Sequence, residues 1–159
     1  MQQSVAKSVE GCLACDLAEG RRPLPGGEIL NTDGWIVEHT VGPLGLGTLI
    51  VKPKRHIVRV ADLSAEEAAA LGPLLRRVAA TVDRLTAADQ VYVCLWSHAG
   101  GEPVHIHFVV QPVTRAEMAA HDAYGPNLQV AQFAAGVFPS AAEIEEFAAR
   151  ARAALDAAP

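Results

Sequence analysis

The chain has 159 residues, half of them hydrophobic, and a formal net charge of −5. This length fits one domain with a sizeable core, and no apolar run approaches the roughly 18 residues of a membrane span. The negative charge argues against a nucleic-acid polymer as partner but leaves room for a single nucleotide. Three cysteines, behind a start without an apolar signal segment, favour reduced thiols in the cytoplasm.

A single Cys-x-x-Cys motif, from Cys12 to Cys15, follows residues 1–10, which are polar and expected to be disordered. Alone, this motif is half a zinc site, a redox pair or two surface cysteines. The redox interpretation requires a preceding strand, and the sequence predicts none there.

Three strands are predicted next. Segments 28–31 and 34–39 should form a hairpin that turns at Asn31-Thr32-Asp33-Gly34. Segment 47–52 is a third strand that ends at Pro53, and His56 follows soon after, where open sheets often carry functional groups.

A long helix should begin after Ser64, because Ser64 and Glu67 have the spacing of a capping box. Leucines and valines follow at helical spacing from residue 71 to residue 85, as in a helix that covers a sheet. Pro73 lies inside this pattern and predicts a kink or a brief break.

The segment 91–112 predicts two strands joined by a loop rich in Gly, Ser and Pro at 97–103. The second strand should begin at Val104. Side chains alternate along a strand, so one face is apolar and should meet the core, with Val104, Ile106, Phe108 and Val110. The other face carries His105, His107, Val109 and Gln111. Two imidazoles roughly 7 Å apart beside a glycine loop predict a functional site.

Beyond residue 112 the sequence predicts a short helix over 114–121, a turn at 124–127 and a capped amphipathic helix after Ser140. Residues 128–138 are apolar without a clear period. The order of hairpin, strand, long helix, hairpin and helix favours an antiparallel sheet covered by helices, in the α+β class.

Four features occur together in order: the Cys12-x-x-Cys15 pair, the segment GTLIVKPKRH at 47–56, a capped helix, and HIHFVVQP at 105–112. This combination resembles the histidine triad (HIT) superfamily of nucleotide hydrolases and transferases, in the branch with an N-terminal zinc-binding pair. The resemblance covers about residues 11–112. It implies one HIT-like domain over 11–159, with about five antiparallel strands under the long helix and a helical tail at 113–159. It also implies a homodimer, with the long helix and the 91–96 strand near the two-fold axis.

The chain departs from the family pattern at three places. Val109 occupies the third position of the triad, where the family has histidine. Glu102 stands where glutamine is common, one residue closer to His105, and His98 stands where asparagine is usual.

The resemblance implies nucleotidyl transfer at an α-phosphate through a covalent histidine intermediate, carried by His107. A neutral imidazole can attack phosphorus at pH 7, and the phosphoramidate that results stays labile to water. Developing phosphate charge needs donors, and the candidates are Ser97, His98, Gly100, Gly101 and Gln111. The nucleoside is expected against Trp35 and Ile36.

In members with the cysteine pair, the thiolates join two histidines around zinc, and the matching positions here are Cys12, Cys15, His56 and His105. A Cys₂His₂ set is closed and tetrahedral, which marks a structural zinc. Two other functions stay open. His105 and His107 could chelate a catalytic metal together with His98 or His56, or the chain could be a non-catalytic nucleotide-binding module, since Val109 removes a phosphate contact.

Overall fold

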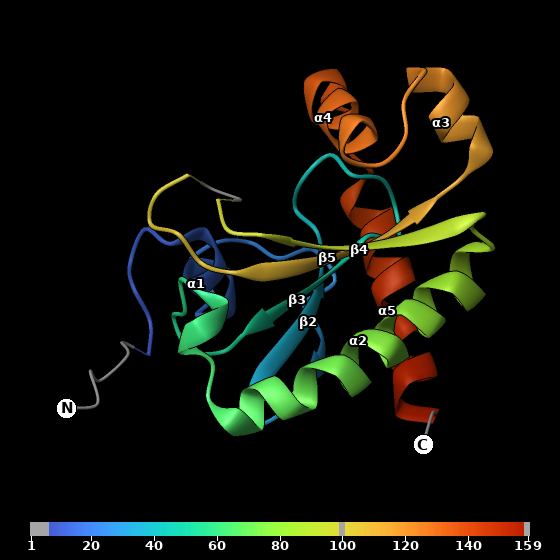
Figure 1. Cartoon of the computed structure of the whole chain (residues 1–159). Coiled ribbons are helices and arrows are strands. Elements are labelled where there is room, and N and C mark those ends of the chain that lie inside the picture. The colour runs from blue at the N-terminus through green and yellow to red at the C-terminus, as the bar shows by residue number, and fades with distance from the viewer. Residues whose placement is uncertain (1–6, 99–100, 158–159) are drawn as a thin grey trace.

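Five antiparallel strands form one sheet in the order β1-β2-β3-β5-β4 in the computed structural model, which describes residues 7–98 and 101–157 (Figure 1). The strands are β1 (Glu28–Asn31), β2 (Trp35–His39), β3 (Leu49–Pro53), β4 (Gln90–Trp96) and β5 (His107–Val113). The first two form the predicted hairpin. The predicted α+β class and the antiparallel sheet of five strands are both confirmed.

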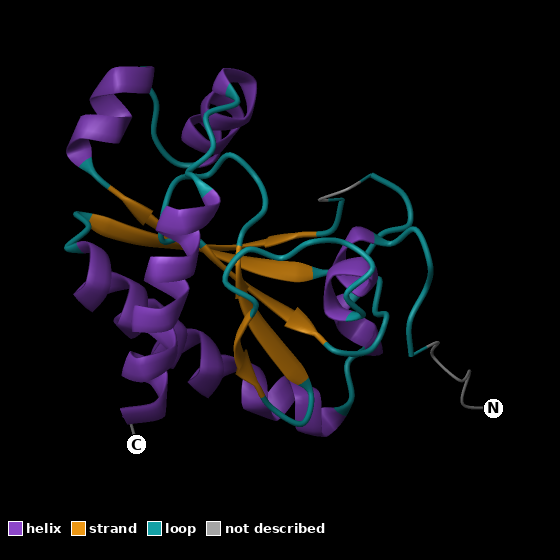
Figure 2. Cartoon of the chain, turned by 180° about the vertical axis from the view of Figure 1, so that it is seen from behind, coloured by secondary structure: helices purple, strands orange, loops and turns teal. Residues whose placement is uncertain are grey.

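Five α-helices and one short 3₁₀ turn surround the sheet: α1 (Leu13–Ala18), the 3₁₀ turn Val60–Asp62, α2 (Ala65–Thr86), α3 (Arg115–His121), α4 (Pro126–Ala135) and α5 (Ala141–Ala157). The long helices α2 and α5 cover one face, and α3 and α4 stand on the opposite side (Figures 1 and 2). No helix in the described part of the chain is long and apolar enough to cross a membrane.

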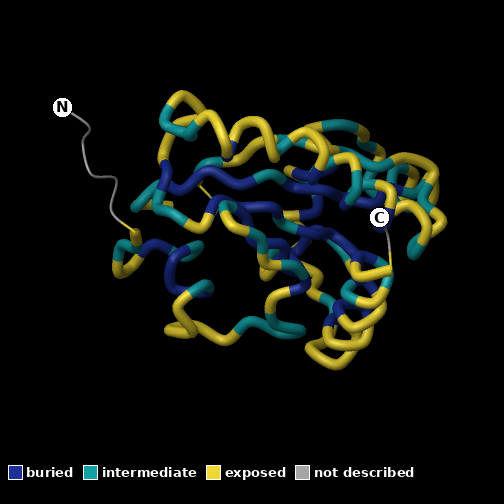
Figure 3. The backbone as a smooth tube through the Cα atoms, turned by 90° about the horizontal axis from the view of Figure 1, so that it is seen from below, coloured by how far each residue is buried: buried dark blue, intermediate teal, exposed yellow. Residues whose placement is uncertain are grey.

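The main core lies between the sheet and helices α2 and α5, and the buried strands run through the middle of the molecule (Figure 3). The sheet contributes the alternate residues Trp35, Val37, Leu49, Val51 and Val110, and α5 contributes Phe147, Ala148, Ala151 and Leu155. The predicted helical tail is therefore part of the core. The strand residues between these core positions lie on the other face of the sheet and form the site described below.

Helix α2 begins at the predicted capping box. Ser64 Oγ accepts a hydrogen bond from the Glu67 amide at 3.1 Å, and a Glu67 carboxylate oxygen accepts one from the Ser64 amide at 2.8 Å. The helix runs through Pro73 without interruption, so the predicted break does not occur. Ala69 and Pro73 are both exposed, so water can satisfy the carbonyl that Pro73 leaves without a donor.

The structure corrects the predicted start of the second strand of the 91–112 segment. Strand β5 begins at His107, not at Val104. The amides just before it are used elsewhere, since His105 N donates to the Ser97 carbonyl at 3.1 Å and Ile106 N donates to the Ile57 carbonyl at 2.9 Å. Residues 128–138 showed no clear period, and most of them fall in α4, which already begins at Pro126 inside the predicted turn. Helix α1 was not predicted at all.

Candidate metal centre and active-site pocket

Four potential metal ligands from three parts of the chain meet at one end of the sheet. Cys12 and Cys15 lie at the start of α1, His56 follows β3, and His105 precedes β5. One ligand atom from each residue lies within 4.8 Å of all the others. The His105 Nδ1 atom lies 3.6 Å from both sulfur atoms, and the His56 Nδ1 atom lies 3.4 Å from Cys15 Sγ.

These distances fit a zinc ion. With Zn–S near 2.3 Å and Zn–N near 2.0 to 2.1 Å, tetrahedral geometry separates sulfur and nitrogen ligands by about 3.6 Å. The second nitrogen of His105, Nε2, lies 3.1 Å from the Pro53 carbonyl oxygen, which can only accept a hydrogen bond. Nε2 therefore carries the proton, and the lone pair of Nδ1 faces the cluster, as in metal-ligating histidines.

Burial also favours the neutral form of the two imidazoles, which is the form that binds a metal. It lowers the pKa of His105 to about 4, against the hydrogen bond to Pro53, and it lowers the pKa of His56. Both rings are thus neutral at pH 7, as metal ligation requires. Burial raises the pKa of the Cys12 thiol, so a bound cation would be needed to hold that sulfur as a thiolate.

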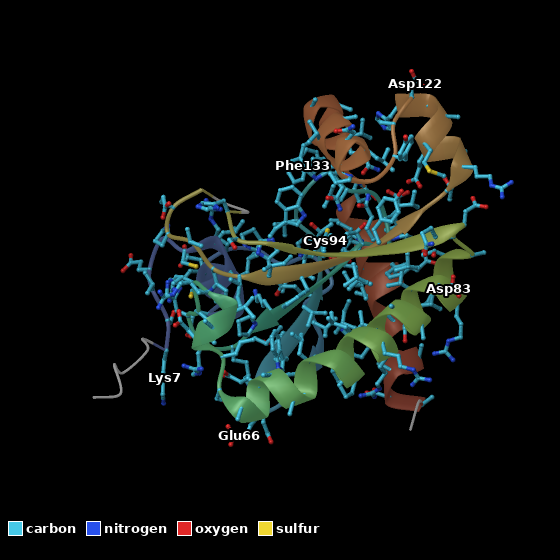
Figure 4. The ribbon with its side chains drawn as sticks, viewed as in Figure 1. Lys7, Glu66, Asp83, Cys94, Asp122 and Phe133 are labelled. Carbon is cyan, nitrogen blue, oxygen red and sulfur yellow. The ribbon has the colours of Figure 1, made fainter. Side chains whose placement is uncertain are left out.

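A pocket of about 440 Å³, called here the His107 pocket, lies on the sheet face away from α2 and α5. Its floor is the sheet, with Glu38, Ile50, Lys52, His107 and Val109. Its walls are mostly apolar and come from α1, the loop after β2, the end of β4 and α4: Leu13, Ala14, Leu17, Thr40, Val41, Gly42, Leu44, Trp96, His98, Val130 and Phe133. Phe133 projects from α4 over the sheet (Figure 4).

His107 is held in one tautomer at the floor of this pocket. Its Nδ1 atom lies 3.1 Å from the His105 carbonyl oxygen, which can only accept, so Nδ1 carries the proton. No described residue hydrogen-bonds Nε2, whose lone pair is therefore available. Burial lowers the pKa of His107, the Lys52 charge lowers it further, and the hydrogen bond to His105 opposes both. The ring is therefore neutral at pH 7.

Next to His107 on the pocket floor lies a buried ion pair, which the sequence analysis missed. Lys52 Nζ donates to Glu38 Oε1 at 2.7 Å and to the Ala14 carbonyl in α1 at 2.9 Å. The two residues are 1% and 2% exposed. Lys52 lies two residues after Ile50 on β3, so its side chain is on the sheet face that also carries His107. This spacing was the signal in the sequence that could have revealed the lysine.

The predicted binding residues are only partly brought together. His98 lines the pocket, with a largely exposed side chain, and Gly101 lies in the loop nearby, whereas Gly100 falls outside the described residues. Ser97 is absent from the lining and uses its carbonyl to hold His105.

The other predicted contacts lie away from the pocket. Trp35 is in the main core, where its indole N–H donates to the Glu67 carbonyl at 3.1 Å. Ile36 is buried and does not line the pocket. The Gln111 amide is fully buried and bonded to Gln132, at 2.7 Å, and to Gln129, at 3.0 Å, both from α4. Gln111 thus anchors the α4 wall of the pocket.

Comparisons with known proteins show which solved structures have a similar fold. No family model matches the chain, and no curated protein matches it by sequence. The fold is similar to that of a Hit-like protein involved in cell-cycle regulation from Bartonella henselae (20% identity, 92% of this chain and 97% of that one, TM-score 0.68). It is also similar to a hypothetical histidine triad nucleotide-binding protein from Sulfolobus tokodaii (15% identity, 91% and 92%, TM-score 0.68). A third similar structure is a zinc-bound histidine triad family protein from Mycobacterium smegmatis (23% identity, 92% and 94%, TM-score 0.62). The chain therefore has the histidine triad fold.

Proposed function

We propose that this protein is a nucleotide hydrolase or nucleotidyl transferase that acts at an α-phosphate, with His107 as the nucleophile. One observation carries the proposal: His107 lies at the floor of a mostly apolar pocket, with Nδ1 bonded to the His105 carbonyl and Nε2 without a partner among the described residues. The similar Sulfolobus tokodaii protein is described as nucleotide-binding, which supports a nucleotide as the occupant.

The reaction has two steps. In the first, the Nε2 lone pair attacks the α-phosphorus, and the leaving group departs with the bonding electron pair and takes a proton from water. In the second, a water oxygen attacks the same phosphorus, the P–N bond breaks, its electrons return to Nε2, and the proton of the water passes to solvent. The product is a nucleoside monophosphate, and a different acceptor in place of water would make the reaction a transfer. Throughout, the His105 carbonyl holds the Nδ1 proton and stabilises the positive charge on the ring.

We also propose that Cys12, Cys15, His56 and His105 hold a structural zinc ion. The donor set is closed, and the Nε2–H of His105 is fixed by Pro53, so the four residues leave no position for a substrate. His107 is not in this cluster. The different partners of His105 and His107 argue against a catalytic metal shared by both.

The proposed assembly is a homodimer through β4. This strand lies at the sheet edge, and Val93 and Leu95 on it are 45% and 41% exposed. Cys12 and Cys15 can hold the proposed zinc only as reduced thiols, which favours a reducing compartment such as the cytoplasm.

One observation favours a second candidate function. Val109 lines the pocket beside His107 but offers no hydrogen bond to phosphate, so a non-catalytic nucleotide-binding module is the alternative. Turnover separates the two functions.

The test is the intact mass of the protein after incubation with a panel of dinucleoside polyphosphates, nucleoside phosphoramidates and adenylated metabolites. We expect a nucleotidyl adduct on the wild type and on a His121→Ala control, whose histidine lies on α3 outside the pocket. His107→Ala should form no adduct and no product while still binding nucleotide. Unchanged turnover in His107→Ala would reject histidine-based transfer, and nucleotide binding without adduct or product in the wild type would establish the binding module.

A further inference from the structure

A lysine side chain lines the floor of the His107 pocket. Phosphoryl and nucleotidyl transfer depend on positive charge and hydrogen-bond donors around the phosphate oxygens. Among the described residues that line the pocket, Lys52 is the one lysine or arginine. Val109, beside it on the floor, is apolar.

The strand register places Lys52 beside His107. Strands β3 and β5 pair antiparallel, with Ile50 opposite Val109 and Val51 opposite Phe108. The next step along both strands sets Lys52 opposite His107, on the face that Ile50 and Val109 share. Side chains that oppose each other in this way have Cβ atoms only about 4.5 to 5.5 Å apart.

The contacts of Lys52 fix its ammonium group and leave a donor free. An ammonium has three N–H groups. One donates to Glu38 Oε1 and one to the Ala14 carbonyl, and the third has no acceptor among the described residues. Both partners anchor the long side chain, so little conformational freedom is left to lose when a ligand binds.

Glu38 is the ion-pair partner of this deeply buried lysine. Buried charges in proteins are paired with a group of opposite sign, and Glu38 Oε1 lies 2.7 Å from Lys52 Nζ. A buried ion pair is a poor stabiliser compared with well-packed apolar residues of similar size. In addition, Glu38 Oε2 has no hydrogen-bond partner in the described part of the chain, which is a further cost to stability. Because the Glu38–Lys52 pair contributes so little to the stability of the fold, its presence favours a role in the pocket.

We propose that Lys52 donates a hydrogen bond to a non-bridging oxygen of the α-phosphate, and so supplies from β3 the contact that Val109 cannot supply from β5. The inference rests on the proposed function, because it names the phosphate ligand of the same site. Lys52 forms no covalent bond and keeps its proton throughout both steps, and Glu38 acts on the reaction by positioning the ammonium.

The test uses two variants and a matched control. Lys52→Met removes the charge and keeps the length of the side chain. Glu38→Leu/Lys52→Met also removes the partner, so that no unpaired carboxylate is left in the interior to unfold the protein. Lys54→Met is the control, since Lys54 is exposed and its Nζ bonds Asn31 and the Thr32 carbonyl outside the pocket.

Two measurements separate a phosphate contact from a structural role. Calorimetry compares each of the four common nucleoside monophosphates with its own nucleoside. We expect Glu38→Leu/Lys52→Met to lose about 10- to 100-fold in affinity for the preferred monophosphate and to bind its nucleoside as the wild type does. The rate of adduct formation at His107 should fall about 10²- to 10³-fold, and Lys54→Met should change neither quantity.

Three outcomes would overturn the proposal: equal loss for nucleotide and nucleoside, no loss for either, or a wild type that binds no monophosphate more tightly than its nucleoside. A different result would reject the proposed reaction alone. If the wild type forms no adduct but the double variant still loses its preference for the monophosphate, Lys52 contacts phosphate in a protein that does not transfer it.

Discussion

Helix α1 should leave the sheet when the metal is removed, while the rest of the fold stays intact. The helix has only six residues, fewer than an isolated helix needs in water. None of its residues belongs to the main core under α2 and α5. Apart from Cys12 and Cys15, burial of Leu17 and the bond from Lys52 to the Ala14 carbonyl tie it to the rest of the fold. Asp16 bonds the adjoining residues Gly11, Arg21 and Arg22, which do not tie the helix to the sheet.

The magnitudes decide the outcome. Burying the Leu17 side chain contributes about 1.5 to 3 kcal/mol, and a hydrogen bond to a charged group contributes about 1.5 to 3 kcal/mol. Ordering the backbone of six residues costs about 6 to 12 kcal/mol. The protein contacts therefore fall short by several kcal/mol, an amount that zinc binding to such a cluster, about 10 to 16 kcal/mol, exceeds.

Hydrogen exchange read by mass spectrometry, before and after dialysis against a chelator, measures this directly. Amides of α1 should lose protection, whereas amides of α5 should keep it. Cys15→Ser should behave like the chelated wild type, and Cys94→Ser, which removes a thiol outside the cluster, should bind one zinc per chain. Unchanged α1 protection after chelation, or protein purified without chelator that holds no zinc, would refute the reasoning. Loss of protection throughout the chain would show that the metal holds the whole fold.

Three further predictions concern other parts of the molecule. Val109→His should restore part of the adduct-forming rate lost in Lys52→Met, because it returns a donor to the same floor, and a double variant no faster than Lys52→Met would contradict this. The Arg55 guanidinium holds the pKa of Glu67 in the folded protein below its ordinary 4.5. The ion pair therefore stabilises the fold fully above pH 4.5, and this contribution is lost as the pH falls through the pKa of Glu67 in the folded protein. The unfolding free-energy difference between wild type and Glu67→Gln should therefore be constant near neutral pH and shrink well below pH 4.5, and a difference independent of pH would exclude the ion pair as its source. Light scattering at micromolar concentration should give the mass of a dimer, and a monomer mass would reject the β4 interface.

Local patterns in the sequence predicted the elements that local chemistry determines. The capping box located the start of α2, and period-two alternation separated His107 and Val109 from Phe108 and Val110 on opposite faces of β5. These features depend on residues within a few positions of one another, so they can be recognised without knowledge of the fold.

The parts that were missed depend on distant partners. Helix α1 is too short to show a period, and its cysteines meet His56 and His105, which are far away in the sequence. Helix α4 turns Gln129 and Gln132 inward onto Gln111, which inverts the usual amphipathic pattern. The Glu38–Lys52 pair joins two strands, and neither charge alone indicated a buried partner.

The walls of the His107 pocket have a consequence for synthesis of the protein. Leu13 and Leu17 come from near the beginning of the chain, and Val130 and Phe133 come from near its end. The last of the four candidate metal ligands is His105, so all four leave the ribosome before α4, which supplies the last wall of the pocket. The nascent chain can therefore bring its four candidate metal ligands together before α4 and α5 are released. The pocket is complete only after α4 has also been released, so a bound nucleotide cannot assist the earlier stages of folding.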